Sequence, residues 1–124
     1  MNIKDLVGYQ LVSINDNEIV VKKGTSVHTL RINYWGGDCC GYNEIDTKLF
    51  ISEDELARNP IITNVDIDGS GCGYSDSAKI TFFGEVKALA ELNSLSSSES
   101  GWQYGACVTI ICDSLNLEEV ITEW

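Results

Sequence analysis

The chain has 124 residues, with 8 Lys and Arg against 19 Asp and Glu, so its formal charge is −11. This length predicts one domain, residues 1–124, with its own core. The acidic balance excludes a nucleic-acid backbone and an anionic membrane surface as direct partners, because both are themselves negative. No apolar run reaches the ~20 residues of a membrane span, and residues 1–10 lack a signal peptide's apolar stretch, so we expect a cytoplasmic protein.

The first third of the chain is predicted to be a meander of three antiparallel strands. Residues 8–15 and 18–23 are short apolar-rich runs, separated by a turn composition of Asn and Asp at 15–17. Residues 28–34 then alternate, with His28, Leu30, Ile32 and Tyr34 on one face.

A short helix is predicted to begin after Ser52. The Ser52 side chain can accept a hydrogen bond from the Glu55 amide while Glu55 reaches back, which is a capping box. Asn59 and Pro60 end this helix after about two turns. Residues 61–67 are predicted to form another strand.

The second half is predicted to contain one long hairpin. Non-polar residues recur at every second position from Ile80 to Leu92, with Gly84 as a bend inside one continuous strand. Its partner is the alternating run 102–112, joined through the polar loop 96–101. The spacing of the last apolar residues favours a C-terminal helix over a strand, although Val and Ile prefer strands. The fold class is therefore α+β, a mainly antiparallel sheet with a long C-terminal-half hairpin and one or two short helices.

Residues 66–77 match the first half of a calcium-binding loop. Asp66, Asp68 and Ser70 occupy positions 1, 3 and 5, and a glycine occupies position 6. Asp76 stands one place before the position where a bidentate Glu is expected. Calcium held by these four residues is one hypothesis, and a glycine-rich hairpin loop is the alternative. No other cofactor is expected.

A glycine-rich segment at 34–42 is a candidate binding loop. Trp35 and Tyr42 flank Asp38, so the loop can stack a ring or hold a partner's arginine. It can equally be a packed corner of the core. Trp102, beside Gly101, is predicted to form a second rim of the same kind.

The cysteines and the single histidine do not predict catalysis. Cysteines at 39, 40, 72, 107 and 112 show no C-x-x-C spacing, so we expect reduced, mostly buried thiols. His28 with Cys39 or Cys40 makes a nucleophilic pair conceivable, but a packed and hydrogen-bonded histidine is favoured on an apolar strand face. Hydrolase, Walker and dinucleotide motifs are absent, so a non-enzymatic protein is expected.

Three segments resemble a family of small uncharacterised phage and prophage proteins, a domain of unknown function. They are Trp-Gly-Gly-Asp-Cys-Cys at 35–40, Ile-Ile at 61–62 and Ser-Glu-Ser-Gly-Trp-Gln-Tyr-Gly-Ala at 98–106. Members of this family carry a Gly-Asp-Cys-Cys signature in the first half and an alternating, β-rich second half, and the resemblance spans most of residues 6–124. It implies an accessory role in the cytoplasm of an infected bacterium and assigns no catalytic residue.

Charge distribution sets the functional hypothesis. Residues 1–60 carry 6 basic and 9 acidic groups, whereas residues 61–124 carry 2 and 10. We expect an acidic accessory protein that binds a basic host protein and inhibits a bacterial defence system. The steering charges would be Glu85, Glu91, Glu99 and Asp113. Acidity that only keeps the protein in solution is the simpler interpretation.

Two other functions stay open. One is a homo-oligomer that sequesters a nucleotide signal, with Trp35, Asp38 and Tyr42 reading the base or ribose. Phosphates would then need Arg31, Lys22 or Lys23 from neighbouring subunits. The other is a structural or interaction domain stabilised by calcium.

Overall fold

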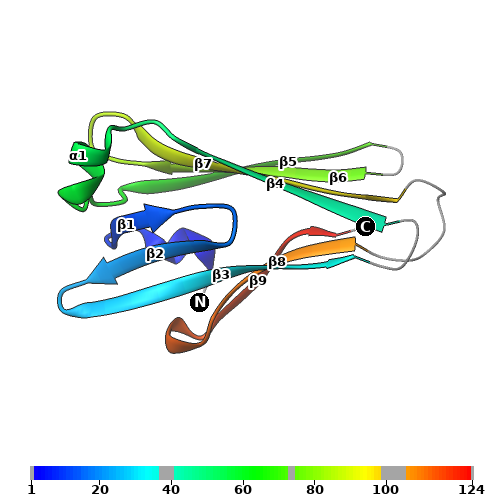
Figure 1. Cartoon of the computed structure of the whole chain (residues 1–124), viewed down its shortest axis with the longest axis horizontal. Coiled ribbons are helices and arrows are strands. Elements are labelled where there is room, and N and C mark those ends of the chain that lie inside the picture. The colour runs from blue at the N-terminus through cyan, green and yellow to red at the C-terminus, as the bar shows by residue number, and fades with distance from the viewer. Residues whose placement is uncertain (1, 37–40, 73–74, 99–105, 124) are drawn as a thin grey trace.

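The computed structural model describes residues 2–36, 41–72, 75–98 and 106–123, without the side chains of 34–36, 41–42, 70–72, 75–76, 97–98, 106 and 123. Within these ranges, nine strands form two antiparallel sheets that lie face to face (Figure 1). The strand order is β1-β2-β3-β8-β9 in the first sheet and β4-β7-β6-β5 in the second. The predicted mainly antiparallel fold is confirmed.

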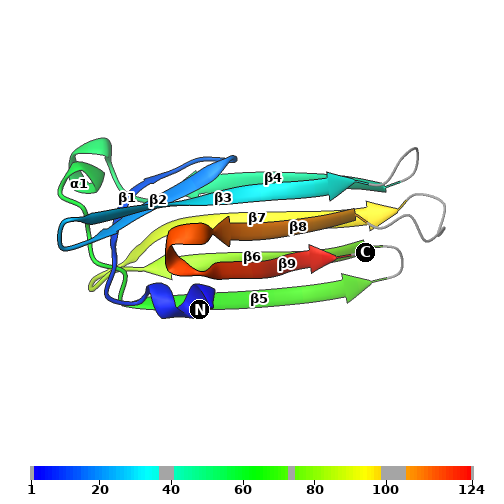
Figure 2. The same cartoon turned by 90° about the horizontal axis from the view of Figure 1, so that it is seen from below.

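The first sheet contains β1 (Gln10–Ile14), β2 (Glu18–Lys23), β3 (Ser26–Gly36), β8 (Ala106–Cys112) and β9 (Leu117–Glu123). The second contains β4 (Gly41–Leu49), β7 (Ala88–Ser98), β6 (Ser75–Phe83) and β5 (Asn64–Cys72). The described residues also contain three short turns of helix: η1 (Ile3–Leu6), α1 (Glu53–Ala57) and η2 (Asp113–Leu115). Figure 2 shows the strands of both sheets running nearly parallel to the long axis.

The core lies between the sheets because each strand turns its apolar alternate residues inward. From the first sheet it contains Ile19, Leu30, Val108 and Ile110, and from the second Ile80, Phe82 and Leu92, all fully buried. Ile3 and Leu6 of η1 join the same cluster. One core therefore holds both sheets and the N-terminal turn.

Hydroxyl groups also bridge the two sheets. Thr122 of β9 is fully buried, and its Oγ1 lies 2.7 Å from Ser94 Oγ and 2.8 Å from Ser96 Oγ, both on β7. Ser96 Oγ also donates a hydrogen bond to Asn43 Oδ1 on β4, at 2.6 Å. Each buried hydroxyl thus has a partner, which offsets the cost of removing it from water.

The predicted three-stranded meander at the start is confirmed. β1 pairs with β2 and β2 with β3, both antiparallel, and Leu30 and Ile32 of β3 are buried as their alternation predicted. The turn at 15–17 is closed by Asn15, whose Oδ1 accepts hydrogen bonds from the amides of Asn17 and Glu18. This local bonding is the usual reason that Asn is favoured in turns.

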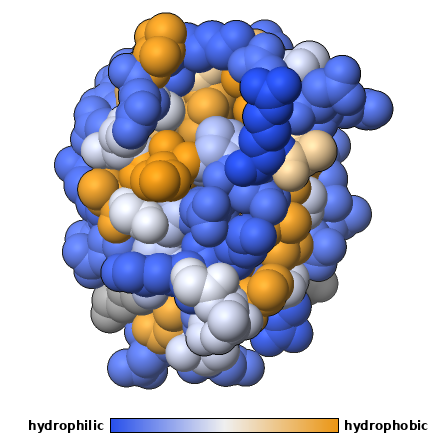
Figure 3. Space-filling model, turned by 90° about the vertical axis from the view of Figure 1, so that its left-hand side faces the viewer, coloured by the Kyte–Doolittle hydropathy of each residue, from blue (hydrophilic) through white to orange (hydrophobic). Residues whose placement is uncertain are grey.

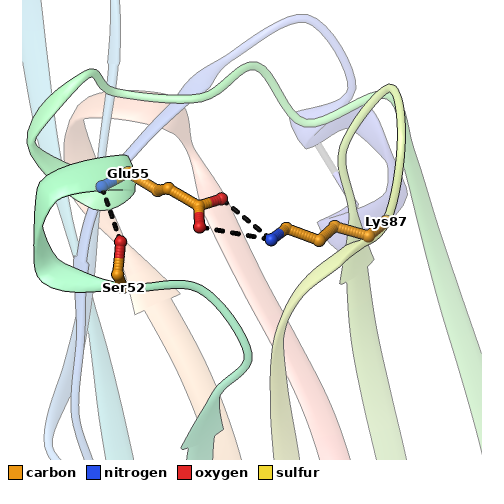
Figure 4. A network of polar contacts seen from close by, with 3 residues as sticks. All are labelled: Ser52, Glu55 and Lys87. Atoms are coloured by element: carbon orange, nitrogen blue, oxygen red, sulfur yellow. Dashed lines mark hydrogen bonds and ion pairs between the residues drawn. The ribbon is translucent and has the colours of Figure 1, made fainter.

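The helix α1 begins where the sequence predicts, but its capping differs. Ser52 Oγ accepts a hydrogen bond from the Glu55 amide at 3.2 Å, as expected. Glu55 does not reach back to complete a capping box; its carboxylate lies 2.9 Å from Lys87 Nζ. Figure 4 shows the two side chains pointing toward each other. The hydrogen bond with Lys87 lowers the pKa of Glu55. This contact attaches α1 to the turn between β6 and β7.

A long hairpin does lie in the C-terminal half, between β6 and β7, but the predicted pairing of one strand at 79–93 with residues 102–112 is wrong. Residues 79–93 are not one strand, because Gly84 begins a tight turn in which its amide donates to the Lys87 carbonyl at 2.8 Å. A Cβ at Gly84 would lie 2.8 Å from Leu89 Cδ2, so the turn favours glycine. β6 and β7 then pair with each other, whereas β8 pairs with β3 and β9 in the opposite sheet.

The predicted C-terminal helix is also wrong, since residues 117–123 form β9. β9 pairs with β8, and its register shifts between Val108 and Thr109 because Ile121 is an additional residue there. Such a bulge breaks the period of two. Val120, which is 51% exposed on the outward face, and Ile121 at the bulge together give the apolar residues a spacing that resembles a helix although the backbone is extended.

The core assignment predicts a large difference between two truncations. Leu92→Ala removes a fully buried side chain and should lower the free energy of unfolding by about 2–5 kcal/mol. Val86→Ala, at a residue that is 94% exposed, should change it by less than about 0.5 kcal/mol. Urea denaturation followed by circular dichroism measures both, and equal effects would contradict the core described above.

Candidate functional site

The outer face of the β4-β7-β6-β5 sheet carries an open hollow of about 630 Å³. We call it the outer-face groove; its lining includes Glu44 and Asp46 of β4, Asn93 and Leu95 of β7, Lys79 of β6 and Asp68 of β5. Its volume lies within the range of about 300–1,000 Å³ that is usual for ligand sites.

Strand register brings these side chains together. Asp46 pairs with Asn93, Asn93 with Lys79, and Lys79 with Asp68, so a single row crosses all four strands. Directly paired residues of antiparallel strands point to the same face. In the neighbouring row, Glu44 of β4 lies opposite Leu95 of β7.

The groove has acidic rims and a less charged floor. Glu44 and Asp46 stand on β4 and Asp68 on β5, the two edge strands of the sheet. Asn93 and Leu95 stand on β7, between them. This arrangement suits a long side chain with a cationic head, because its aliphatic stem can pack on Leu95 while the head reaches a carboxylate.

Glu91 neutralises the lysine of the groove. Its side chain is only 9% exposed, and its Oε1 lies 3.1 Å from Lys79 Nζ. Asn93 Nδ2 donates to Glu91 Oε2 at 3.1 Å, and this bond together with the lysine lowers the pKa of Glu91 although burial acts in the opposite direction. The Lys79 charge is therefore already paired.

The face as a whole is negative. Its described outward positions carry the acids Glu44, Asp46, Asp66, Asp68 and Glu91 against the bases Lys48 and Lys79. Lys79 is paired with Glu91 and not with a rim carboxylate. Glu44, Asp46 and Asp68 are exposed, so these rim carboxylates are accessible to a partner.

The structure does not bring the predicted steering charges together. Glu85 lies in the turn between β6 and β7, and Asp113 lies in η2 of the other sheet, with its Oδ2 3.9 Å from the exposed Arg31. Glu91 is buried and paired with Lys79, so its charge is already engaged within the chain. Glu99 lies outside the described residues.

The predicted aromatic loop falls largely outside the described residues. Asp38 and Trp102 are not among them, nor are Cys39 and Cys40. The backbone places Trp35 near the end of β3, paired with Cys107, and Tyr42 near the start of β4, paired with Ser97. The loop stays a prediction.

The calcium hypothesis required a turning loop, but the backbone there is extended. Asp66, Asp68 and Ser70 lie in β5, and Asp76 lies in β6, paired with Gly71. A calcium loop instead wraps its ligands around the ion. Within the described part of the chain, no group of three His, Cys, Asp or Glu side chains is placed to hold a metal ion.

His28 is packed and hydrogen-bonded, as predicted. Its Nδ1 lies 2.8 Å from Ser114 Oγ, and its ring meets that of Tyr9 edge-on at 6.1 Å between centroids. Cys107 and Cys112 are free thiols, half-buried and buried respectively.

The basic residues Lys22 and Arg31 lie on neighbouring strands. Lys22 of β2 lies opposite Val27, whereas Arg31 of β3 lies opposite Glu18, four residues from Lys22 along β2, so the two side chains do not converge within one chain.

A second hollow, of about 380 Å³, lies at the end of the sandwich that carries α1. Its lining mixes Arg58 and Lys87 with Glu55, Glu85 and apolar side chains. Figure 3 views this end and shows the apolar residues as separate patches among hydrophilic ones. No single chemistry dominates there, so the outer-face groove is the better candidate.

Most groove residues were missed by the sequence analysis; only Asp68 was named, as a calcium ligand. Strand β4 itself was not predicted. The available signal was the alternation of Glu44, Asp46 and Lys48 with Ile45 and Thr47.

By its fold and its groove, the protein is an antiparallel β-sandwich that carries an acidic groove on the outer face of one sheet. Comparison of the chain with protein-family models, curated proteins and solved structures found no match. No described helix is long and apolar enough to cross a membrane.

The pairing of Glu91 predicts a pH-dependent contribution to stability. Glu91→Gln should lower the free energy of unfolding by about 1–3 kcal/mol at neutral pH, because a hydrogen-bonded buried charge is lost. The lowered pKa means that this stabilisation is complete above the unfolded pKa, about 4.3, and is lost as pH falls through the folded value.

Urea midpoints of wild type and variant should therefore differ most at neutral pH and converge as the pH falls below the unfolded pKa and through the lower folded pKa. Glu118→Gln, at an exposed residue of β9, is the control and should change stability by less than about 0.5 kcal/mol. A difference between wild type and Glu91→Gln that does not change with pH would contradict the assigned role.

Proposed function

We propose that this chain is a non-enzymatic binding protein that holds a basic partner protein at the outer-face groove. The observation that supports this most directly is the row Asp46-Asn93-Lys79-Asp68, with an exposed carboxylate at each rim. Lysine or arginine side chains of a partner complement such rims. The resemblance to phage proteins supports a host protein as this partner, and a bacterial defence protein as its proposed class.

Electrostatics should act mainly on recognition and on the rate of association. Exposed charge pairs contribute ~0.2–1 kcal/mol each, so no single rim carboxylate is expected to dominate. Together they attract a basic surface, and this attraction weakens with added salt. Affinity beyond that requires contact with the floor of the groove, where Leu95 offers apolar surface.

The test uses a fluorescent peptide of sequence Lys-Thr-Lys-Val-Lys-Thr-Lys and fluorescence anisotropy. The triple variant Glu44→Gln, Asp46→Asn, Asp68→Asn should bind it about tenfold more weakly, because it loses three rim charges of ~0.5 kcal/mol each. Binding to the wild type should also weaken as salt increases.

The matched control removes the same charge elsewhere. Glu53→Gln, Asp54→Asn, Glu118→Gln changes three exposed acids outside the groove and should reduce affinity less than about twofold. Thermal melting checks that both variants fold. Equal losses in both variants would show attraction to overall charge only, and absence of peptide binding would refute the proposed function.

A further inference from the structure

Strand β5 has a free edge beside the groove. β5 is the last strand in the order β4-β7-β6-β5, so one side pairs with β6, and among the described residues no strand pairs with the other. Figures 1 and 2 together place the N-terminal turn beneath β5, on its core side, rather than along this edge. Backbone amides and carbonyls of an unpaired edge can pair with an added strand.

Three other sheet edges are partly covered by polar or backbone contacts. At β4, the amide and hydroxyl of Thr47 donate to Asp16 Oδ1 at 3.1 and 2.7 Å. At β1, Gln10 forms a bridge with Ile61. At β9, Glu119 Oε2 accepts a hydrogen bond from the Ile3 amide at 3.3 Å. In the part of the chain that the structure describes, no comparable hydrogen bond reaches the outer edge of β5.

The side chains of β5 specify the strand that would pair with it. Asp66 and Asp68 are exposed on the outer face, while Val65 is buried and Ile67 is 36% exposed. The side chains of an added strand would also alternate between the two faces of the sheet. Its residues paired with the two aspartates would face outward, and the residue between them would lie beside Ile67 on the other face. Lysine or arginine at every second position, with apolar or β-branched residues between, complements this pattern.

A second copy of the chain fits this edge poorly. If two β5 strands paired antiparallel about Ile67, Asp66 of each copy would lie opposite Asp68 of the other. Like charges directly opposite each other destabilise strand pairing. The charge pattern thus opposes self-association and favours a basic segment.

The edge and the groove are continuous. Asp68 and Gly69 line the groove and also belong to β5. A long basic side chain on an added strand can therefore extend from the edge across Asp68 into the groove, while its backbone bonds to β5.

We propose that the partner binds by strand addition: an extended segment with alternating basic residues pairs with the free edge of β5 and projects its basic side chains over Asp66, Asp68 and the outer-face groove. This inference rests on the proposed function, since it specifies how the same groove is occupied. It names the chemistry of the partner as an extended, alternating basic peptide.

The test compares the peptide Lys-Thr-Lys-Val-Lys-Thr-Lys with two forms N-methylated on alternate residues. N-methylation removes amide donors and blocks one edge of the peptide, whereas charge and sequence stay the same. At least one methylated form should bind the wild-type protein ten or more times more weakly than the parent. A peptide of the same composition with its four lysines contiguous should also bind more weakly.

Amide hydrogen exchange gives a second measurement on the protein. The parent peptide should slow the exchange of amides within residues 64–69 and leave those of β2 unchanged. If both methylated forms bind as well as the parent and β5 is not protected, strand addition is refuted while the groove function stands. If the parent does not bind, the proposed function fails. A dimer that protects β5 without peptide would overturn the inference in favour of a second copy.

Discussion

The register of β7 between β4 and β6 is the constraint on which both the core and the groove depend. Even-numbered residues of β7, including Leu92, Ser94 and Ser96, face the core and are buried. Odd-numbered residues, including Glu91 and Asn93, face outward and line up with charged residues of β4 and β6. A slip of one residue would exchange the two sets, exposing the core and burying the carboxylates. The hydrophobic effect that fixes the core therefore also positions the groove.

Charge on this sheet has two physical consequences. Acidic side chains on the edge strands β4 and β5 oppose pairing between copies, as edge charges do in many β proteins. The same carboxylates give the face a negative potential that attracts a basic partner. Glu91 adds a third element, because it pairs with Lys79 and so keeps the groove's one described lysine from repelling that partner. Protection against self-association and recognition of a basic segment are compatible roles of one pattern.

Two errors of the sequence analysis arise because alternation alone does not show where a chain turns or bulges. Phe82 pairs with Ala90, so the even-numbered residues up to Phe82 and from Ala90 onward share one face, and the bulge at Leu89 is the interruption between them. A continuous strand and a hairpin then show nearly the same pattern of alternation, and the sequence did not distinguish them. In β9 the bulge at Ile121 has the opposite effect, because it breaks the alternation of a real strand. Hydrophobic periodicity reports which face a residue occupies but not how the chain turns.

By itself, the sequence determined the strand-rich class, the opening meander, the Ser52 helix start and the acidity, because these depend on local periodicity, turn chemistry and composition. Tertiary structure alone decided that β8 pairs with β3 and not with β7, and that Asp46 and Asp68 stand in one row at opposite edges of the second sheet. Such pairings join residues far apart in the chain. They are selected by the packing of both sheets around one core, which no local pattern encodes.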